Sequence, residues 1–148
     1  MLPSSEVSTS PIPVLRGIRV LMVEDDEDTQ DTMRLMLEME GAVVACARSA
    51  AEGLRAFFAQ RPDVLVCDLG LPGMNGYDLI GQVLERRRAR GKKAIPACAV
   101  SAFVREIDRE RAIDAGFDSY IKKPMTAQRL IEAVVELAAV ASENESRA

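Results

Sequence analysis

The chain has 148 residues, which is enough for one domain of ordinary size. Apolar residues make up 48% of it, charged residues 28%, and the formal net charge is −4. This composition is globular, and its small acidic excess argues against a general nucleic-acid binder, whose affinity depends on neutralising phosphates. Histidine is absent, which excludes histidine-based acid–base catalysis, most catalytic zinc sites and a phosphohistidine on this chain.

The two ends of the chain differ in composition from the middle. Residues 1–15 contain closely spaced prolines and serines and show no hydrophobic period, so we expect a disordered N-terminal arm. Residues 141–148 are mostly small or polar, which predicts a frayed tail. A single domain is therefore predicted over residues 16–140.

Five short apolar runs are typical of strands that are buried on both faces of a parallel sheet. Their brevity, their valine and isoleucine content and the breakers that flank them favour strands over buried helices. The runs cover residues 18–23, 42–47, 63–68, 94–100 and, more weakly, 118–122.

A longer amphipathic segment follows each run and predicts a helix. These segments cover residues 27–40, 50–60, 76–90, 103–115 and 127–140. Ser49, Asn75 and Thr126 are expected to cap helix starts, and Gly41, Gly91 and Gly116 to end helices. Strands that alternate five times with helices predict one doubly wound α/β domain.

The cysteines and the absence of long apolar stretches indicate the cellular compartment of the protein. Cys46, Cys67 and Cys98 lie far apart in apolar segments, which is typical of buried thiols in a reducing compartment. No apolar stretch approaches the roughly 18 residues of a membrane helix, and the first residues lack the pattern of a secretory signal. We expect a cytoplasmic protein without membrane insertion.

Polar residues follow four of the five predicted strands. In an open parallel sheet the ligand site lies beyond the carboxyl ends of the strands. Glu24, Asp25 and Asp26 follow the first strand, Asp68 ends the third, Ser101 follows the fourth, and Lys122 and Lys123 follow the fifth. Taken singly, such residues are ordinary helix caps, turn formers and surface charges.

Taken together, the same residues indicate phosphoryl chemistry. Three carboxylates at one edge would repel one another unless they were protonated or bound to a cation, and Mg²⁺ prefers such oxygen ligands. A hydroxyl and an ammonium on the flanking strands could hold the oxygens of a phosphoryl group. The combination suits phosphorylation of an aspartate.

Four motifs make residues 17–140 resemble the CheY-like receiver domains of two-component response regulators. They are VLMVEDDEDT, DVLVCDLGLPGMNGYDLI, AVSA and YIKKP, in this order. Asp25, Asp68, Ser101 and Lys123 follow one another at intervals of 43, 33 and 22 residues. The resemblance implies a flavodoxin-like fold with strand order 2-1-3-4-5, and the stretch around AVSA and YIKKP is similar to receivers attached to hybrid sensor kinases.

The resemblance also implies roles for individual residues. Glu24 and Asp25 would position Mg²⁺, Asp68 would be both phosphoacceptor and metal ligand, and the backbone carbonyl of Gly70 would complete the metal site. Ser101 would bind the phosphoryl group, Lys123 would pair with it, and Tyr120 would be the aromatic side chain that follows phosphorylation; Lys122 is read as surface charge. Glu24 and Ser101 stand where aspartate and threonine are common, and Leu71 where methionine is, without loss of the chemistry.

The predicted function is that of a single-domain response regulator. Asp68 would accept a phosphoryl group from a sensor histidine kinase or a histidine phosphotransfer protein, and a downstream protein partner would recognise the face formed by residues 103–115, 118–122 and 127–140. The chain would catalyse only its own phosphorylation and dephosphorylation, and so would not be an enzyme acting on other substrates. No direct contact with nucleic acid is expected, and the basic run 85–93 is interpreted as a solvated helix end.

Three alternatives remain open from the sequence. One is an interaction module that has this fold but is not phosphorylated. Another is an aspartyl-phosphate phosphatase, although that class would need a second aspartate where this chain has Gly70. The third is a flavin-binding protein, although the first strand–helix loop is acidic and not a phosphate cradle.

Overall fold

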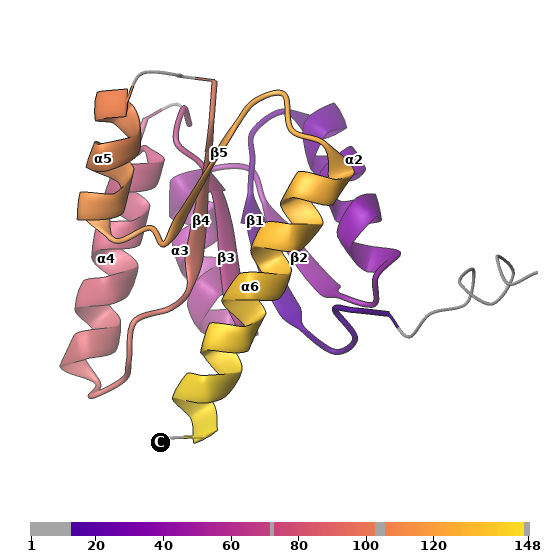
Figure 1. The fold of residues 1–148 in the computed structure, drawn as a ribbon. Helices are drawn as coiled ribbons and strands as arrows, with labels where there is room; N and C mark the ends of the chain where they lie inside the picture. The colour runs from indigo at the N-terminus through magenta and orange to yellow at the C-terminus, as the bar shows by residue number, and fades with distance from the viewer. Residues whose placement is uncertain (1–12, 72, 103–105, 147–148) are drawn as a thin grey trace, which may run out of the picture.

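The structure, a computed structural model, describes residues 13–71, 73–102 and 106–146. These residues form a five-stranded parallel sheet between two layers of helices, with α2 and α6 on one face and α3, α4 and α5 on the other (Figure 1). The strands are β1 (Arg19–Val23), β2 (Val43–Ala47), β3 (Val64–Asp68), β4 (Ala97–Ser101) and β5 (Ser119–Lys122). The helices are α2 (Glu27–Glu38), α3 (Ala50–Gln60), α4 (Gly76–Ala89), α5 (Glu106–Ala115) and α6 (Ala127–Ser146).

The strand order is β2-β1-β3-β4-β5, which confirms the expected doubly wound topology. Every neighbouring pair is parallel, so all five strands end at the same edge of the sheet. Of the three inner strands, β3 and β4 are buried at every residue, because helices cover both of their faces. The outer strand β2 is more open, and Val43 on it is 55% exposed.

Two hydrophobic cores lie on the two faces of the sheet. One fills the space between the sheet and α3, α4 and α5, and includes Leu79, Ile80 and Phe117. The other fills the space beneath α2 and α6, and includes Met33 and Leu130. Together they hold the strands in register and so fix the relative positions of the residues that end them.

The helix starts agree with the predicted caps. The side chains of Ser49, Asn75 and Thr126 each accept a hydrogen bond from the backbone N–H group three residues on. Asn75 and Asp78 form a reciprocal capping box. The start predicted for α5 at residues 103–105 lies outside the described residues.

Three expectations need correction. The predicted arm ends before residue 15: Leu15 is completely buried, and its N–H group donates to the carbonyl of Glu40 at 2.8 Å. Helix α6 extends to Ser146, so the described part of the predicted tail is helical. Cys67 and Cys98 are buried as expected, but Cys46 is only half-buried because it lies on the edge strand β2.

Within the described residues, no helix has the length and hydropathy required to cross a membrane.

Candidate functional site

Three carboxylates meet at the carboxyl edge of the sheet. Glu24 and Asp25 directly follow β1, Asp68 is the last residue of β3, and these two strands are neighbours. One carboxylate oxygen from each residue lies within 4.8 Å of the other two. Glu24 and Asp68 are 1% and 7% exposed, whereas Asp25 faces solvent. The structure therefore brings together the three side chains that the sequence suggested as metal ligands.

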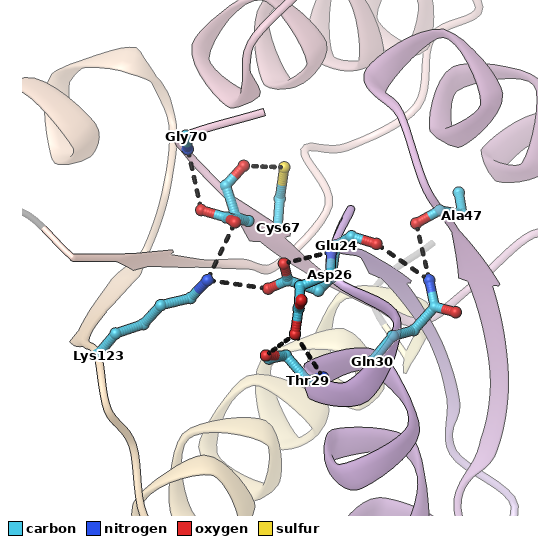
Figure 2. A network of polar contacts seen from close by, with 9 residues as sticks. Glu24, Asp26, Thr29, Gln30, Ala47, Cys67, Gly70 and Lys123 are labelled. Carbon is cyan, nitrogen blue, oxygen red and sulfur yellow. Dashed lines mark hydrogen bonds and ion pairs between the residues drawn. The ribbon is translucent and has the colours of Figure 1, made fainter. Parts of the chain in front are cut away.

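Lys123 supplies the positive charge of this cluster. Its Nζ atom lies 3.0 Å from Oε1 of Glu24 and 3.0 Å from Oδ2 of Asp68 (Figure 2). Lys123 directly follows β5, and its backbone N–H group donates to the carbonyl of Ser101 at 2.8 Å, which ties this residue to the end of β4. The ammonium group is thus positioned by its own strand and by the neighbouring one.

The other oxygens of the two buried carboxylates also accept hydrogen bonds. The N–H group of Asp26 donates to Oε2 of Glu24 at 3.0 Å, and the N–H group of Gly70 donates to Oδ1 of Asp68 at 2.9 Å. These contacts fix the rotamers of both side chains, and so their lone pairs have defined directions.

Burial and hydrogen bonding have opposing effects on the pKa values of Glu24 and Lys123. Burial raises the pKa of Glu24 above its ordinary value, although the hydrogen bonds from Asp26 and Lys123 oppose that shift. Burial lowers the pKa of Lys123, but its hydrogen bonds to Glu24 and Asp68 and their charges outweigh burial and raise the pKa overall. Lys123 is therefore a permanent cation at neutral pH.

Asp26 belongs to the helix and not to the cluster. It is the N-cap of α2, and its Oδ2 atom accepts hydrogen bonds from the backbone N–H and the hydroxyl of Thr29, at 2.9 and 2.6 Å. These two bonds hold the pKa of Asp26 below its usual range. Of the three consecutive acidic residues, Asp26 thus caps α2, and Glu24 and Asp25 remain in the acidic cluster.

Gln30 is a site residue that sequence reasoning missed. It is buried on α2, and its Nε2 atom donates to the carbonyls of Glu24 and Ala47, each at 3.1 Å (Figure 2). It therefore connects the ends of β1 and β2 and supports the backbone of Glu24. The sequence feature that could have revealed Gln30 is its position, as a polar residue, on the same face of α2 as the buried Met33 and Leu37.

The remaining predicted residues lie around this cluster. Ser101 ends β4 and is 1% exposed, and Tyr120 on β5 is half-buried against the core beneath α3, α4 and α5. Gly70 contributes the N–H contact to Asp68, and its role as a metal ligand through its carbonyl stays a prediction. Lys122 is the last residue of β5 and is exposed.

A cavity of about 560 Å³ opens beside Lys123, between α2 and the loop from β5 to α6. Methionines form an apolar part of its wall, and Asp28, Thr29 and Thr32 form a polar part. The methionines are Met33, Met36 and Met125. The acidic cluster is thus bordered by a recess large enough to receive a side chain from another molecule.

Comparison with known proteins agrees with this geometry. The chain matches the family model of the response regulator receiver domain over residues 20–135. It is 42% identical over 120 residues to the "uncharacterized 14.6 kDa protein in sodA1 3′ region" of Leptolyngbya boryana, covering 81% of this chain and 89% of that protein. It is 35% identical over 112 residues to the transcriptional regulatory protein CseB of Streptomyces coelicolor, covering 76% of this chain and 45% of that regulator. The chain thus spans about half the length of CseB.

The fold has close counterparts among solved structures. A CheY-like response regulator receiver domain protein from Methanospirillum hungatei JF-1 superposes with a TM-score of 0.76 at 27% identity, covering 86% of this chain and 98% of that one. Because the family match extends from the first strand into the last helix, and the strand order agrees with it, this chain belongs to the family of response regulator receiver domains.

Proposed function

We propose that the chain is a phosphorylation switch of a cytoplasmic two-component system. A phosphohistidine on a sensor histidine kinase or on a histidine phosphotransfer protein donates its phosphoryl group to Asp68. The observation that carries this proposal is the position of the buried Asp68 carboxylate, 3.0 Å from Lys123 and within 4.8 Å of two further carboxylates. A buried aspartate is by itself no sign of a phosphoacceptor, so the proposal depends on these neighbouring charges.

The transfer itself needs positioning and charge stabilisation. An oxygen of Asp68 attacks phosphorus, an oxygen–phosphorus bond forms, and the phosphorus–nitrogen bond of the donor breaks, leaving imidazole on the partner. The ammonium of Lys123 already lies at 3.0 Å from Asp68, where it can stabilise the negative charge of the phosphoryl oxygens. Water later hydrolyses the acyl phosphate, so the chain catalyses only its own modification and acts on no independent substrate.

The acidic residues fit one hard divalent cation. Glu24, Asp25 and Asp68 supply oxygen ligands from two adjacent strands, and Mg²⁺ prefers oxygen and retains several waters. When bound, Mg²⁺ would neutralise charge on the phosphoryl oxygens. The carbonyl of Gly70 is proposed as a further ligand. This donor set has no histidine or thiolate, so a softer metal such as zinc fits it less well.

The output of the switch is proposed for the face formed by α5, β5 and α6. Phosphorylation adds charge and acceptor oxygens near Ser101, whose hydroxyl would move to donate to them. Tyr120 on the adjacent strand β5 would then repack against the core, and a downstream protein would read the changed face. Beryllofluoride, which mimics the phosphoryl group, should shift the amide signals of residues 106–125; changes confined to the β1–α2 and β3–α4 loops would contradict this output.

The phosphoacceptor is tested with acetyl phosphate and Mg²⁺ followed by intact-mass spectrometry. Wild type should gain one base-labile phosphoryl group, and Asp68→Asn should gain none. Asp114→Asn, a matched loss of a carboxylate from the exposed surface of α5, should be labelled like the wild type. Labelling that persists on Asp68→Asn would place the acceptor elsewhere, and a wild type that is never labelled would favour the non-phosphorylated interaction module.

A further inference from the structure

The C-terminal end of α4 and the turn after it form a strongly basic surface, which we call the basic patch. Its members are Arg86, Arg87, Arg88, Arg90, Lys92 and Lys93. With Glu85 included, residues 85–93 carry a net charge of +5 in a chain whose total is −4, so the rest of the chain carries −9. Positive charge is therefore concentrated in this one segment of the chain. No residue of the basic patch belongs to the site at the carboxyl edge of the sheet.

Two arginines of the basic patch are held over one aromatic ring. The Cζ atom of Arg90 lies 4.6 Å from the ring centroid of Phe58, and that of Arg86, one helical turn earlier, lies 5.9 Å from the same centroid. Phe58 is half-buried on α3, which packs against α4. A guanidinium attracted to an aromatic ring keeps N–H groups that can donate to an anion. Both groups are thus positioned before any partner arrives.

Arg87 fixes the turn that carries the remaining cations. Its Nε atom donates to the carbonyl of Lys93 at 2.6 Å, and its Cζ atom lies 5.9 Å from the ring centroid of Phe57. The other five members of the basic patch are exposed. In the part of the chain that the structure describes, no carboxylate forms an ion pair with any member of the basic patch. Their charge is therefore available to a partner.

We propose that the basic patch docks an acidic segment of a partner protein, a short run of aspartates and glutamates. Carboxylates match the two-pronged N–H edge of arginine, and two guanidinium groups over one ring can receive neighbouring carboxylates. A nucleic acid fits less well, because a long polyanion would extend beyond the basic patch onto a surface of net negative charge. A segment of a few residues covers the basic patch alone.

The basic patch lies far from the phosphoacceptor. Helix α4 begins after the carboxyl end of β3 and runs back toward the opposite edge of the sheet, where β4 begins (Figure 1). An acidic segment bound there leaves Asp68 and Lys123 open to a phosphoryl donor. The docking site would tether the chain to a partner whether or not Asp68 is phosphorylated.

The test is fluorescence anisotropy with a labelled octapeptide of alternating Glu and Asp, at low salt, on the full chain. Arg86→Gln/Arg90→Gln should weaken binding about tenfold, because two positioned charges are lost. Arg48→Gln/Arg129→Gln removes the same charge from exposed positions outside the basic patch and should change affinity by less than about twofold. Phe58→Leu keeps every charge but removes the ring, and should weaken binding by about threefold.

Three results would overturn the proposal. The first is equal binding of the acidic peptide and a Gln/Asn peptide of the same length. The second is equal binding of the acidic peptide to wild type and to Arg86→Gln/Arg90→Gln, with circular dichroism showing that both are folded. The third is tighter binding of a labelled single-stranded oligonucleotide than of the peptide, which would make the basic patch a nucleic-acid surface. Labelling of Asp68 by acetyl phosphate should proceed equally with the peptide bound, and its loss would contradict the independence of the two sites.

Discussion

The ammonium group of Lys123 stabilises the domain and would also compete with Mg²⁺ for the same carboxylates. It is paired with Glu24 and Asp68, two carboxylates that burial would otherwise penalise. The same two carboxylates are the proposed ligands of Mg²⁺, so ammonium and metal draw on the same negative charge. Removing the lysine should therefore have opposite effects on folding and on metal binding.

Lys123→Met should lower the free energy of unfolding in EDTA by about 1–3 kcal/mol, because Glu24 and Asp68 lose their counter-charge in a partly solvated pair. Mg²⁺ should stabilise this variant more than the wild type, since no ammonium competes for the carboxylates. Urea unfolding with and without Mg²⁺ measures both effects. Lys122→Met is the matched control: this exposed neighbour should change stability by less than about 0.5 kcal/mol. Equal effects of the two substitutions would contradict the pairing.

At the scale of elements, two connections decide how the layers meet. The segment before β1 packs under α2 through Leu15 and bonds to the turn after α2, so it closes the core on that side. On the other face, Gly116 ends α5 with a φ of +124°, and a Cβ atom there would lie 2.4 Å from Cδ1 of Leu84 on α4. This close approach and this backbone conformation both favour glycine.

Leu15→Ala should destabilise the domain by about 2–4 kcal/mol, because it removes a completely buried side chain and leaves a cavity. Its neighbour offers the control, since Val14 is 57% exposed and Val14→Ala should cost less than about 0.5 kcal/mol. Chemical unfolding followed by circular dichroism measures both. Similar small changes for both variants would mean that the segment is a loose arm after all.

Gly116→Ala should destabilise by about 1–3 kcal/mol, through the strained backbone and the contact with Leu84. Gly81→Ala should do the opposite: Gly81 lies inside α4, is exposed, and a Cβ atom there meets nothing within 4 Å. Alanine at such a helix position is worth about 0.5–1 kcal/mol. The melting temperature should therefore fall for Gly116→Ala and rise for Gly81→Ala. A change of the same sign in both variants would contradict one of these two predictions.

At the scale of the whole molecule, the sheet gathers negative charge at its carboxyl edge. Parallel pairing puts Glu24, Asp25 and Asp68 together, and Lys123 offsets only part of their charge. Repulsion among these carboxylates thus lowers the stability of the domain at its proposed phosphorylation site. Favourable packing elsewhere in the fold must offset this loss of stability.

Asp25→Asn should raise the melting temperature in EDTA, by the equivalent of about 0.5–1 kcal/mol, because one charge of the acidic cluster is removed. It should also abolish the stabilisation by Mg²⁺, which in wild type amounts to about 1.4 kcal/mol at ten times the dissociation constant. Asp114→Asn is the matched control and should leave both unchanged. An Asp25→Asn variant that Mg²⁺ still stabilises fully would remove this residue from the metal site.

The sequence by itself determined the order and type of the elements and the residues that end the strands. Apolar runs, helical periods and caps such as Asn75 act over a few residues, so they can be read locally. The resemblance of four motifs then indicated the strand order, which the structure has. Two boundaries differ from the prediction: the fourth strand begins at Ala97 and not at residue 94, and α6 extends beyond residue 140.

Only the tertiary structure decided which side chains meet. Lys123 bonds to Glu24 and Asp68, which lie 99 and 55 residues away, and Gln30 bridges two strand ends. Two arginines lie over the ring of Phe58 because α3 packs against α4. Such contacts depend on how helices pack on the sheet and on the register of its strands, and no local period in the sequence specifies either.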